Sequence, residues 1–169
     1  MLQIKNIKGE DASIIFSTKA GLQIAKLIFN YPHKSFHIRE LARLTSFSTT
    51  AITKAIENLE KYKLIKVEMN VAKEIKANID SESYANYKLI FNIYRIMRYG
   101  LINTIKVFLN NPECIVLFGS FAKGEDIEES DIDLLIITNN KINSDLNPFI
   151  TVWEKEFNRK INLHILKLK

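Results

Sequence analysis

The sequence predicts an α+β protein with two domains: N-terminal helices followed by a β-hairpin, then a C-terminal domain built on a small mixed sheet. Three observations support this prediction. Helical periodicity of apolar residues dominates residues 20–63, and alternating apolar and polar residues follow it. Further along the chain, two apolar runs flank a polar, acidic segment, as two strands joined by a loop would.

The net charge is divided unevenly along the 169 residues. Residues 1–80 contain 13 Lys and Arg and 8 Asp and Glu, which gives 13 − 8 = +5, whereas residues 81–169 contain 11 of each and are neutral. This division predicts two modules with different partners, with boundaries at 1–80 and 82–169. A positive first module is what a polyanion would bind.

Other classes of protein are excluded by composition. No apolar run approaches the roughly 20 residues of a membrane span, and the N-terminus lacks the basic-then-apolar layout of a signal peptide. The single cysteine, Cys114, excludes an internal disulfide framework and a cysteine-rich zinc site. We therefore expect a cytoplasmic protein with no membrane partner, and a buried Cys114 at the start of a strand.

The first domain is predicted to contain three helices and a hairpin. Helices are expected at residues 20–31, 37–45 and 49–63, the third capped by Ser48 or Thr49, and strands at 65–70 and 74–80. Three helices followed by a hairpin make a winged helix-turn-helix. Residues 36–68 resemble the reader segment of many prokaryotic DNA-binding proteins.

By this resemblance, the third helix enters the major groove of double-stranded DNA, and the hairpin touches the DNA backbone or the minor groove. The winged helix could instead make only protein contacts, since Glu57 and Glu60 interrupt the positive surface of the third helix. Such readers commonly pair on symmetric sites, which favours a homodimer. The residues expected to contact DNA share an outward position on the third helix or the hairpin: Ser48, Thr49, Thr50, Thr53, Lys54, Lys66 and Lys73.

The second domain is predicted to open with helical residues 82–110, divided near Gly100. An aromatic stripe on this segment indicates core packing or a dimer seam: Tyr84, Tyr87, Phe91 and Tyr94. A later helix over residues 148–160, capped by Asp145, is expected to bury Phe149, Val152, Trp153 and Phe157. Residues 161–168 are expected to form the last strand.

The strongest functional signal is Gly119-Ser120, then ten residues, then Asp131-Ile132-Asp133. Side chains two apart on a strand share a face, so Asp131 and Asp133 should project together. Paired carboxylates favour a hard divalent cation such as Mg²⁺, which prefers oxygen ligands and shares them with phosphates. The Gly-Ser turn, followed by a helix start with free N–H groups, would suit the phosphates.

This pattern resembles the minimal nucleotidyltransferase domains of the DNA polymerase β superfamily, over residues 99 to 169. The resemblance implies transfer of a nucleoside monophosphate from a nucleoside triphosphate (ATP is the expected substrate) with a two-metal Mg²⁺ site. It implies that Asp131 and Asp133 are catalytic and hold the metals, and that Gly119, Ser120 and Lys123 bind the nucleotide.

Active members of the superfamily usually carry a third carboxylate on the third strand, at a position that falls here on Asn162. Its amide oxygen is a further candidate metal ligand, and His164 points to the same side, but neither residue is a carboxylate. The spacer between Ser120 and Asp131 offers other acids: Glu125, Asp126, Glu128 and Glu129. The sequence favours an enzyme and leaves open whether the site is catalytically competent.

Two functions follow. The first is a metal-dependent nucleotidyltransferase tethered to a DNA-binding module, with a protein or nucleic acid as acceptor. Small proteins of this superfamily often belong to toxin–antitoxin pairs, where the acceptor is a partner protein or an RNA. The alternative is a DNA-binding transcriptional regulator in which the nucleotidyltransferase fold binds a nucleotide but is catalytically silent.

Overall fold

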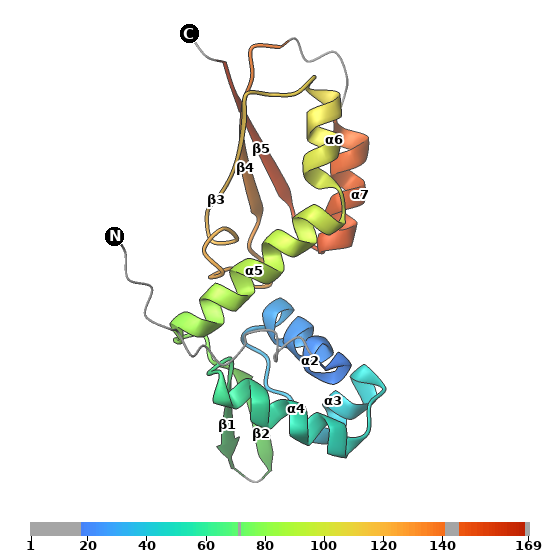
Figure 1. Ribbon diagram of the computed structural model, residues 1–169, viewed down its shortest axis with the longest axis vertical. Helices are drawn as coiled ribbons and strands as arrows, with labels where there is room; N and C mark the ends of the chain where they lie inside the picture. Colours follow the sequence, from blue (N-terminus) through green and yellow to red (C-terminus); the bar gives the residue numbers. More distant parts are fainter. Residues whose placement is uncertain (1–17, 71, 141–145, 168–169) are drawn as a thin grey trace, which may run out of the picture. The chain divides into compact units, whose positions relative to one another are not determined.

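The computed structural model describes residues 18–70, 72–140 and 146–167. Within these residues the chain forms six helices and five strands, in two separate sheets, so the protein is α+β (Figure 1). It divides into two compact units, Met1–Ser81 and Glu82–Lys169. No helix of the described residues is both long and apolar enough to cross a membrane.

The described part of unit 1, from residue 18 onward, contains three helices followed by two strands. The helices are α2 (Lys19–Asn30), α3 (Ile38–Thr45) and α4 (Thr49–Lys61), and the strands β1 (Ile65–Met69) and β2 (Lys73–Ala77) pair antiparallel. Ser48 caps α4, because its hydroxyl accepts a hydrogen bond from the Ala51 N–H at 3.3 Å. The order of the elements is therefore the one that the sequence predicted.

The core of unit 1 lies between the helices and the hairpin. Ile24, Ile52 and Ile75, from α2, α4 and β2, are fully buried. Phe36, which precedes α3, is also fully buried and forms a β-bridge with Ile75. Met69 is 73% exposed at the hairpin end, so the alternation expected for the first strand does not extend to its last residue.

Among its described residues, unit 2 consists of three helices and a three-stranded sheet. The elements are α5 (Glu82–Arg98), α6 (Leu101–Phe108), β3 (Cys114–Phe118), β4 (Ile132–Ile137), α7 (Asn147–Phe157) and β5 (Ile161–Leu166). Gly100 adopts a left-handed conformation (φ 71°) and divides α5 from α6, as predicted. The strand order is β3-β4-β5, with β3 antiparallel and β5 parallel to β4.

One face of this sheet is covered by α6 and α7 (Figure 1). The core on that face joins Ile105 of α6, Leu134 of β4 and Trp153 of α7, all buried. The other face carries Asp133, Leu135 and Ile137 of β4, which are only half-buried, together with exposed side chains of β3 and β5. The two faces are therefore unequally covered.

Three burial predictions are wrong. Cys114 is exposed, because it begins β3 on the open face of the sheet. Phe149 and Val152 are 39% and 57% exposed, and only Trp153 and Phe157 carry the buried face of α7. In the aromatic stripe of α5, Tyr84 and Phe91 are buried, as core packing requires, whereas Tyr94 is 57% exposed, so the alternative of a dimer seam stays a prediction for that residue. The expected cap Asp145 lies outside the described residues.

Candidate functional site

The candidate site begins where β3 ends. The register of the sheet places Phe118 beside Asp133, so the next residue, Gly119, turns away directly next to that carboxylate. Gly119 has φ +76°, and a Cβ atom there would lie 2.7 Å from Asp133 Oδ2. Only glycine can therefore adopt this turn and leave the carboxylate in place.

Asp131, Asp133 and Asn162 lie together on the neighbouring strands. Asp133 pairs with Asn162 in the parallel register of β4 and β5, and Asp131 stands two residues before Asp133. The Asn162 amide nitrogen donates hydrogen bonds to Asp131 Oδ2 at 3.2 Å and to Asp133 Oδ1 at 2.9 Å. One amide thus spans both carboxylates, so the two aspartates project to the same side, as the i, i+2 spacing predicts.

The three side chains bring several oxygen atoms together. Asp131 and Asp133 take part in no ion pair with any other described residue. The described residues contain no group of three or more His, Cys, Asp and Glu side chains that could hold a metal ion. Two half-buried carboxylates and the amide oxygen of Asn162 suit a hard divalent cation, with one charged ligand fewer than a three-carboxylate site.

The turn after β3 differs from the prediction. Residues 119–124 form successive turns and no helix starts there, so the expected helix-terminus site for phosphates is wrong. Instead the Ser120 carbonyl accepts two backbone hydrogen bonds, from the Lys123 N–H at 3.0 Å and the Glu125 N–H at 3.1 Å. These bonds close a compact turn from which the Lys123 side chain is exposed.

The acids of the spacer differ in whether they lie near Asp131 and Asp133. Asp126 is 1% exposed and is ion-paired with Lys88 and Arg159, which removes it as a source of the third carboxylate. Glu128 and Glu129 line an open pocket of about 730 Å³ together with Asp131.

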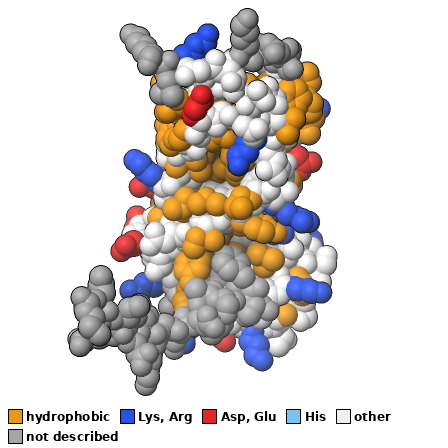
Figure 2. All heavy atoms as spheres, turned by 45° about the horizontal axis from the view of Figure 1, so that its top comes forward, with side chains coloured by type: hydrophobic (Ala, Val, Ile, Leu, Met, Phe, Trp, Pro, Cys, Tyr) orange, Lys and Arg blue, Asp and Glu red, His pale blue; other side chains and the backbone are white. Residues whose placement is uncertain are grey.

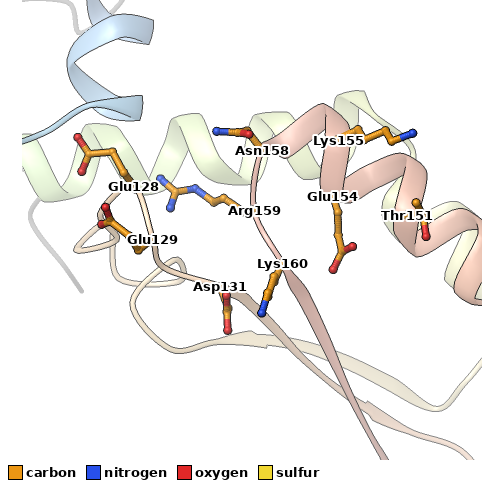
Figure 3. A pocket seen from close by; sticks show the side chains of 9 residues that line it. All are labelled: Glu128, Glu129, Asp131, Thr151, Glu154, Lys155, Asn158, Arg159 and Lys160. Carbon is orange, nitrogen blue, oxygen red and sulfur yellow. The ribbon is translucent and has the colours of Figure 1, made fainter.

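The same pocket is also lined by three cations from α7 and the segment after it. Arg159 and Lys160 come from the segment between α7 and β5, and Lys155 comes from α7 itself. Figure 3 shows Lys160 beside Asp131, with both side chains projecting in the same direction from adjacent strand starts. A cation next to the first aspartate is suited to contact an anionic ligand bound there.

His164, the other candidate on β5, lies on the open face of the sheet. It is exposed, and its ring centroid lies 5.5 Å from that of Phe118. In the sheet register Phe118 lies beside Asp133, and His164 lies beside Leu135, two residues further along β4.

The residues expected to contact DNA are in unit 1, and most are accessible. Thr53 is half-buried, and its hydroxyl donates to the Thr49 carbonyl at 2.9 Å. Lys66 is ion-paired with Asp80 at 2.7 Å, so its charge is partly neutralised. Those that are exposed are Ser48, Thr49, Thr50, Lys54, Lys66 and Lys73.

The positive side chains do not gather in one patch on the face seen in Figure 2, where Lys and Arg lie singly among hydrophobic and uncharged ones. On the hairpin, Lys76 bonds Glu68 at 2.6 Å and Glu74 at 3.2 Å. Lys54 and Lys73 have no such pair with a described residue, so they are the cations of this set most available to a polyanion.

Residues 101–169 match a family of nucleotidyltransferase domains, described as Polymerase beta, Nucleotidyltransferase. The matched segment begins with α6 and includes all three strands of unit 2, Gly119 and both aspartates. Neither the curated proteins nor the solved structures gave a match. The similarity supports a nucleotidyltransferase domain in this part of the chain, and with it the transfer of nucleoside monophosphates in general.

Proposed function

We propose that the protein is a metal-dependent nucleotidyltransferase that transfers a nucleoside monophosphate from a nucleoside triphosphate, with ATP as the expected donor. The observation that carries this proposal is the contact between the Gly119 turn and the Asp133 carboxylate. A turn suited to a triphosphate and a pair suited to a divalent cation then share one edge of the sheet, and the family match covers both.

In this proposal each residue has a defined role. Asp131 and Asp133 hold Mg²⁺, and Asn162 joins them through its amide oxygen after the amide has turned over. Gly119 and Ser120 bring the backbone to the phosphates, and the exposed Lys123 meets their charge. The bound metal would supply neutralisation of the phosphate oxygens.

A second function is favoured by Asn162 itself. An amide in place of a carboxylate carries no charge and cannot take up the acceptor's proton, which suits a fold that binds a nucleotide without transferring it. The protein would then be a DNA-binding transcriptional regulator that responds to a nucleotide.

Both functions include a DNA-binding role for unit 1. The order of its elements, three helices and a hairpin, is that of a winged helix-turn-helix, and α4 presents exposed polar residues. We propose that Ser48, Thr49, Thr50 and Lys54 meet double-stranded DNA and that a homodimer binds a symmetric site. The first function also places the protein in a toxin–antitoxin type pair, with a partner protein or an RNA as acceptor.

The two functions are separated by incubating the full chain with Mg²⁺, α-labelled ATP and cell extract. A nucleotidyltransferase transfers label to a protein or RNA, and Asp131→Asn and Asp133→Asn abolish this transfer while the protein stays folded. Glu156→Gln, at an exposed position of α7, is the matched control. Retained ATP binding without transfer would select the regulator, and transfer that survives both aspartate changes would overturn the site.

A further inference from the structure

We propose that a buried polar cluster in unit 2 is a positioning device for the candidate site, and that it fixes the Gly119 turn and Asp131 relative to each other. The cluster consists of Lys88 and Asn92 of α5, Asp126 of the spacer and Arg159 before β5. This inference rests on the proposed function, because it assigns these residues to the same site.

The cluster is centred on the Asp126 carboxylate. Its Oδ2 atom lies 3.0 Å from Arg159 Nη2 and 3.4 Å from Lys88 Nζ, and its Oδ1 atom accepts from Asn92 Nδ2 at 2.8 Å. All four side chains are buried, with Lys88 and Asp126 each 1% exposed. Two cations and an amide from distant parts of the chain thus converge on one acid in the middle of the spacer.

The cluster also binds the backbone at both ends of the spacer. Near the turn, Asn92 Nδ2 donates to the Phe121 carbonyl at 3.0 Å, one residue after Ser120. Near the aspartates, Arg159 Nη1 donates to the Ser130 carbonyl at 3.0 Å, the residue directly before Asp131, and to the Ile127 carbonyl. The phosphate turn and the first aspartate are therefore held by neighbouring members of one cluster.

Between these two ends the spacer is pressed against α5. Gly124 has φ +70°, and a Cβ atom there would overlap the Ala85 carbonyl oxygen. Lys88, one helical turn after Ala85, donates to the Asp126 carbonyl. The spacer therefore has little freedom to shift along α5, although most of its residues lie in turns or irregular backbone.

Stability alone does not account for such a cluster. Burial lowers the pKa of Lys88 and the Asp126 charge opposes that change, so the ion pair offsets a penalty that an apolar side chain would not incur. Well-packed apolar residues of similar volume often replace buried ion pairs without loss of stability. Directional bonds from Arg159 to the Ile127 and Ser130 carbonyls, which apolar residues cannot make, fix the backbone entering Asp131.

Figure 3 shows the Arg159 side chain extending from the start of β5 toward the spacer segment that carries Glu128 and Glu129. β5 also carries Asn162, three residues after Arg159. The same short stretch of chain therefore holds the backbone before Asp131 through Arg159, and it contacts the Asp131 side chain through Asn162. A shift of the spacer should therefore be visible at the Asn162 amide.

The test uses the full chain and two readouts. One is the ¹⁵N–¹H signal of the Asn162 side-chain amide, which reports its hydrogen bonds to Asp131 and Asp133 without any nucleotide. The other is the affinity for Mg²⁺ and a non-hydrolysable ATP analogue. Arg159→Lys keeps the charge but loses the planar fork; it should move the Asn162 signal and weaken the analogue's binding by about tenfold or more. Arg98→Lys, at an exposed position of α5, should change neither.

Asn92→Leu provides a second variant. It leaves Asp126 paired with Lys88 and Arg159, and it removes the amide's bonds to the Phe121 carbonyl and to Asp126 Oδ1. It should weaken binding of the analogue to a similar degree. If Arg159→Lys does not fold, Asn92→Leu decides whether the cluster positions the candidate site. Unchanged affinity and an unchanged Asn162 signal in the folded variants would overturn the positioning role. A wild-type protein that binds no analogue would refute the proposed function, and the Asn162 signal of Arg159→Lys would still decide whether the cluster positions Asp131.

Discussion

Asp131, Asp133 and Asn162 are hydrogen-bonded to one another, and Asn162→Asp should turn this group into three carboxylates that require a cation. The wild-type amide nitrogen lies 2.9 Å from Asp133 Oδ1 and 3.2 Å from Asp131 Oδ2, and it donates to both. The substitution replaces these two bonds by two carboxylate–carboxylate contacts. At about 4 Å and an effective dielectric constant of about 20, each contact between full charges costs about 4 kcal/mol.

Proton uptake limits this penalty. The pKa of the introduced carboxyl rises above its unfolded value of about 4. Keeping one carboxyl protonated costs about 1.4 kcal/mol for each pH unit above that value, which amounts to about 4 kcal/mol at pH 7. The penalty is present at neutral pH and disappears as the pH falls toward 4, because the folded state then binds its extra proton freely. We expect a loss of about 2–4 kcal/mol at pH 7 and about 1 kcal/mol at pH 5.

Thermal unfolding with EDTA and with Mg²⁺, at pH 7 and pH 5, measures these effects. In EDTA at pH 7 the variant should melt below the wild type by about 4–8 °C for each kcal/mol, as expected for a unit of this size. Mg²⁺ at about one hundred times its dissociation constant should restore about 2.7 kcal/mol. If the missing carboxylate limits the chemistry, transfer of labelled AMP should also increase.

Asn162→Ala is the control, since it removes both hydrogen bonds without adding charge. It should lose stability to the same extent at pH 7 and pH 5 and gain nothing specific from Mg²⁺. Equal melting temperatures of Asn162→Asp and wild type in EDTA, with no response of the variant to Mg²⁺, would refute the reasoning, because the three side chains would then not lie together.

Three further predictions follow from the structure. Asp126→Asn leaves two buried cations with one neutral partner and should lower the free energy of unfolding by about 3–5 kcal/mol in a denaturant titration. Lys88→Met leaves Asp126 and Arg159 as a single ion pair and should change the free energy of unfolding by less than about 2 kcal/mol. Equal losses in the two variants would contradict this prediction. Gly119→Ala should reduce ATP-analogue binding by about tenfold in a fluorescence titration, because of positive φ and the nearby carboxylate; unaltered affinity would exclude the turn from the site. Lys54→Ala should reduce the slope of log affinity for duplex DNA against log salt by about one, and an unchanged slope would remove this residue from the interface.

The arrangement of the candidate site followed from local rules. A Gly-Ser pair at the end of an apolar run predicted a turn, and the spacing of Asp131 and Asp133 predicted a shared side, which Asn162 confirms by bonding both. The position of Asn162 beside them depends on the parallel pairing of β4 and β5, which the sequence indicated only through the family resemblance. Strand periodicity therefore sufficed to predict that the two carboxylates share a side, but it did not predict that Asn162 lies beside them on the neighbouring strand.

The buried cluster was not predictable in the same way. Asp126 reads as a solvated acid among other acids of a loop, but its partners Lys88 and Arg159 are 38 and 33 residues away in the chain. One signal was available: Lys88 stands between Tyr84 and Phe91 at helical spacing, so the buried stripe of α5 passes through a charged residue. A charge on an apolar stripe indicates a buried partner elsewhere, although it does not say which one.

The exposed positions were mispredicted for a common reason. Cys114 belongs to a strand that is apolar on both faces, so alternation cannot distinguish the covered face from the open one. Val152 belongs to the first half of α7, where apolar residues occur nearly all round the helix, so helical periodicity does not define the edge of the buried stripe. Burial there is decided by which side of the sheet α6 and α7 occupy, and that is a property of the assembled unit.

The Asn162 amide also predicts how a metal ion would be bound. The Asn162 side-chain N–H groups donate to both carboxylates, so a cation must displace two charge-assisted hydrogen bonds, each contributing about 1.5–3 kcal/mol. Two carboxylates and a neutral amide also attract a divalent ion less than three carboxylates do. Mg²⁺ alone should therefore bind weakly, and the charge of the nucleotide phosphates should be needed to complete its ligands.

Isothermal titration with Mg²⁺, in the presence and absence of a saturating ATP analogue, measures this coupling. We expect the analogue to tighten Mg²⁺ binding by more than about tenfold in the wild type, and by much less in Asn162→Asp, whose added carboxylate supplies the missing charge. Reciprocity requires that Mg²⁺ tighten binding of the analogue by the same factor. Equal coupling in the two proteins would show that the residue at 162 does not contribute to the metal site, and the low charge of the site would then have to be compensated elsewhere.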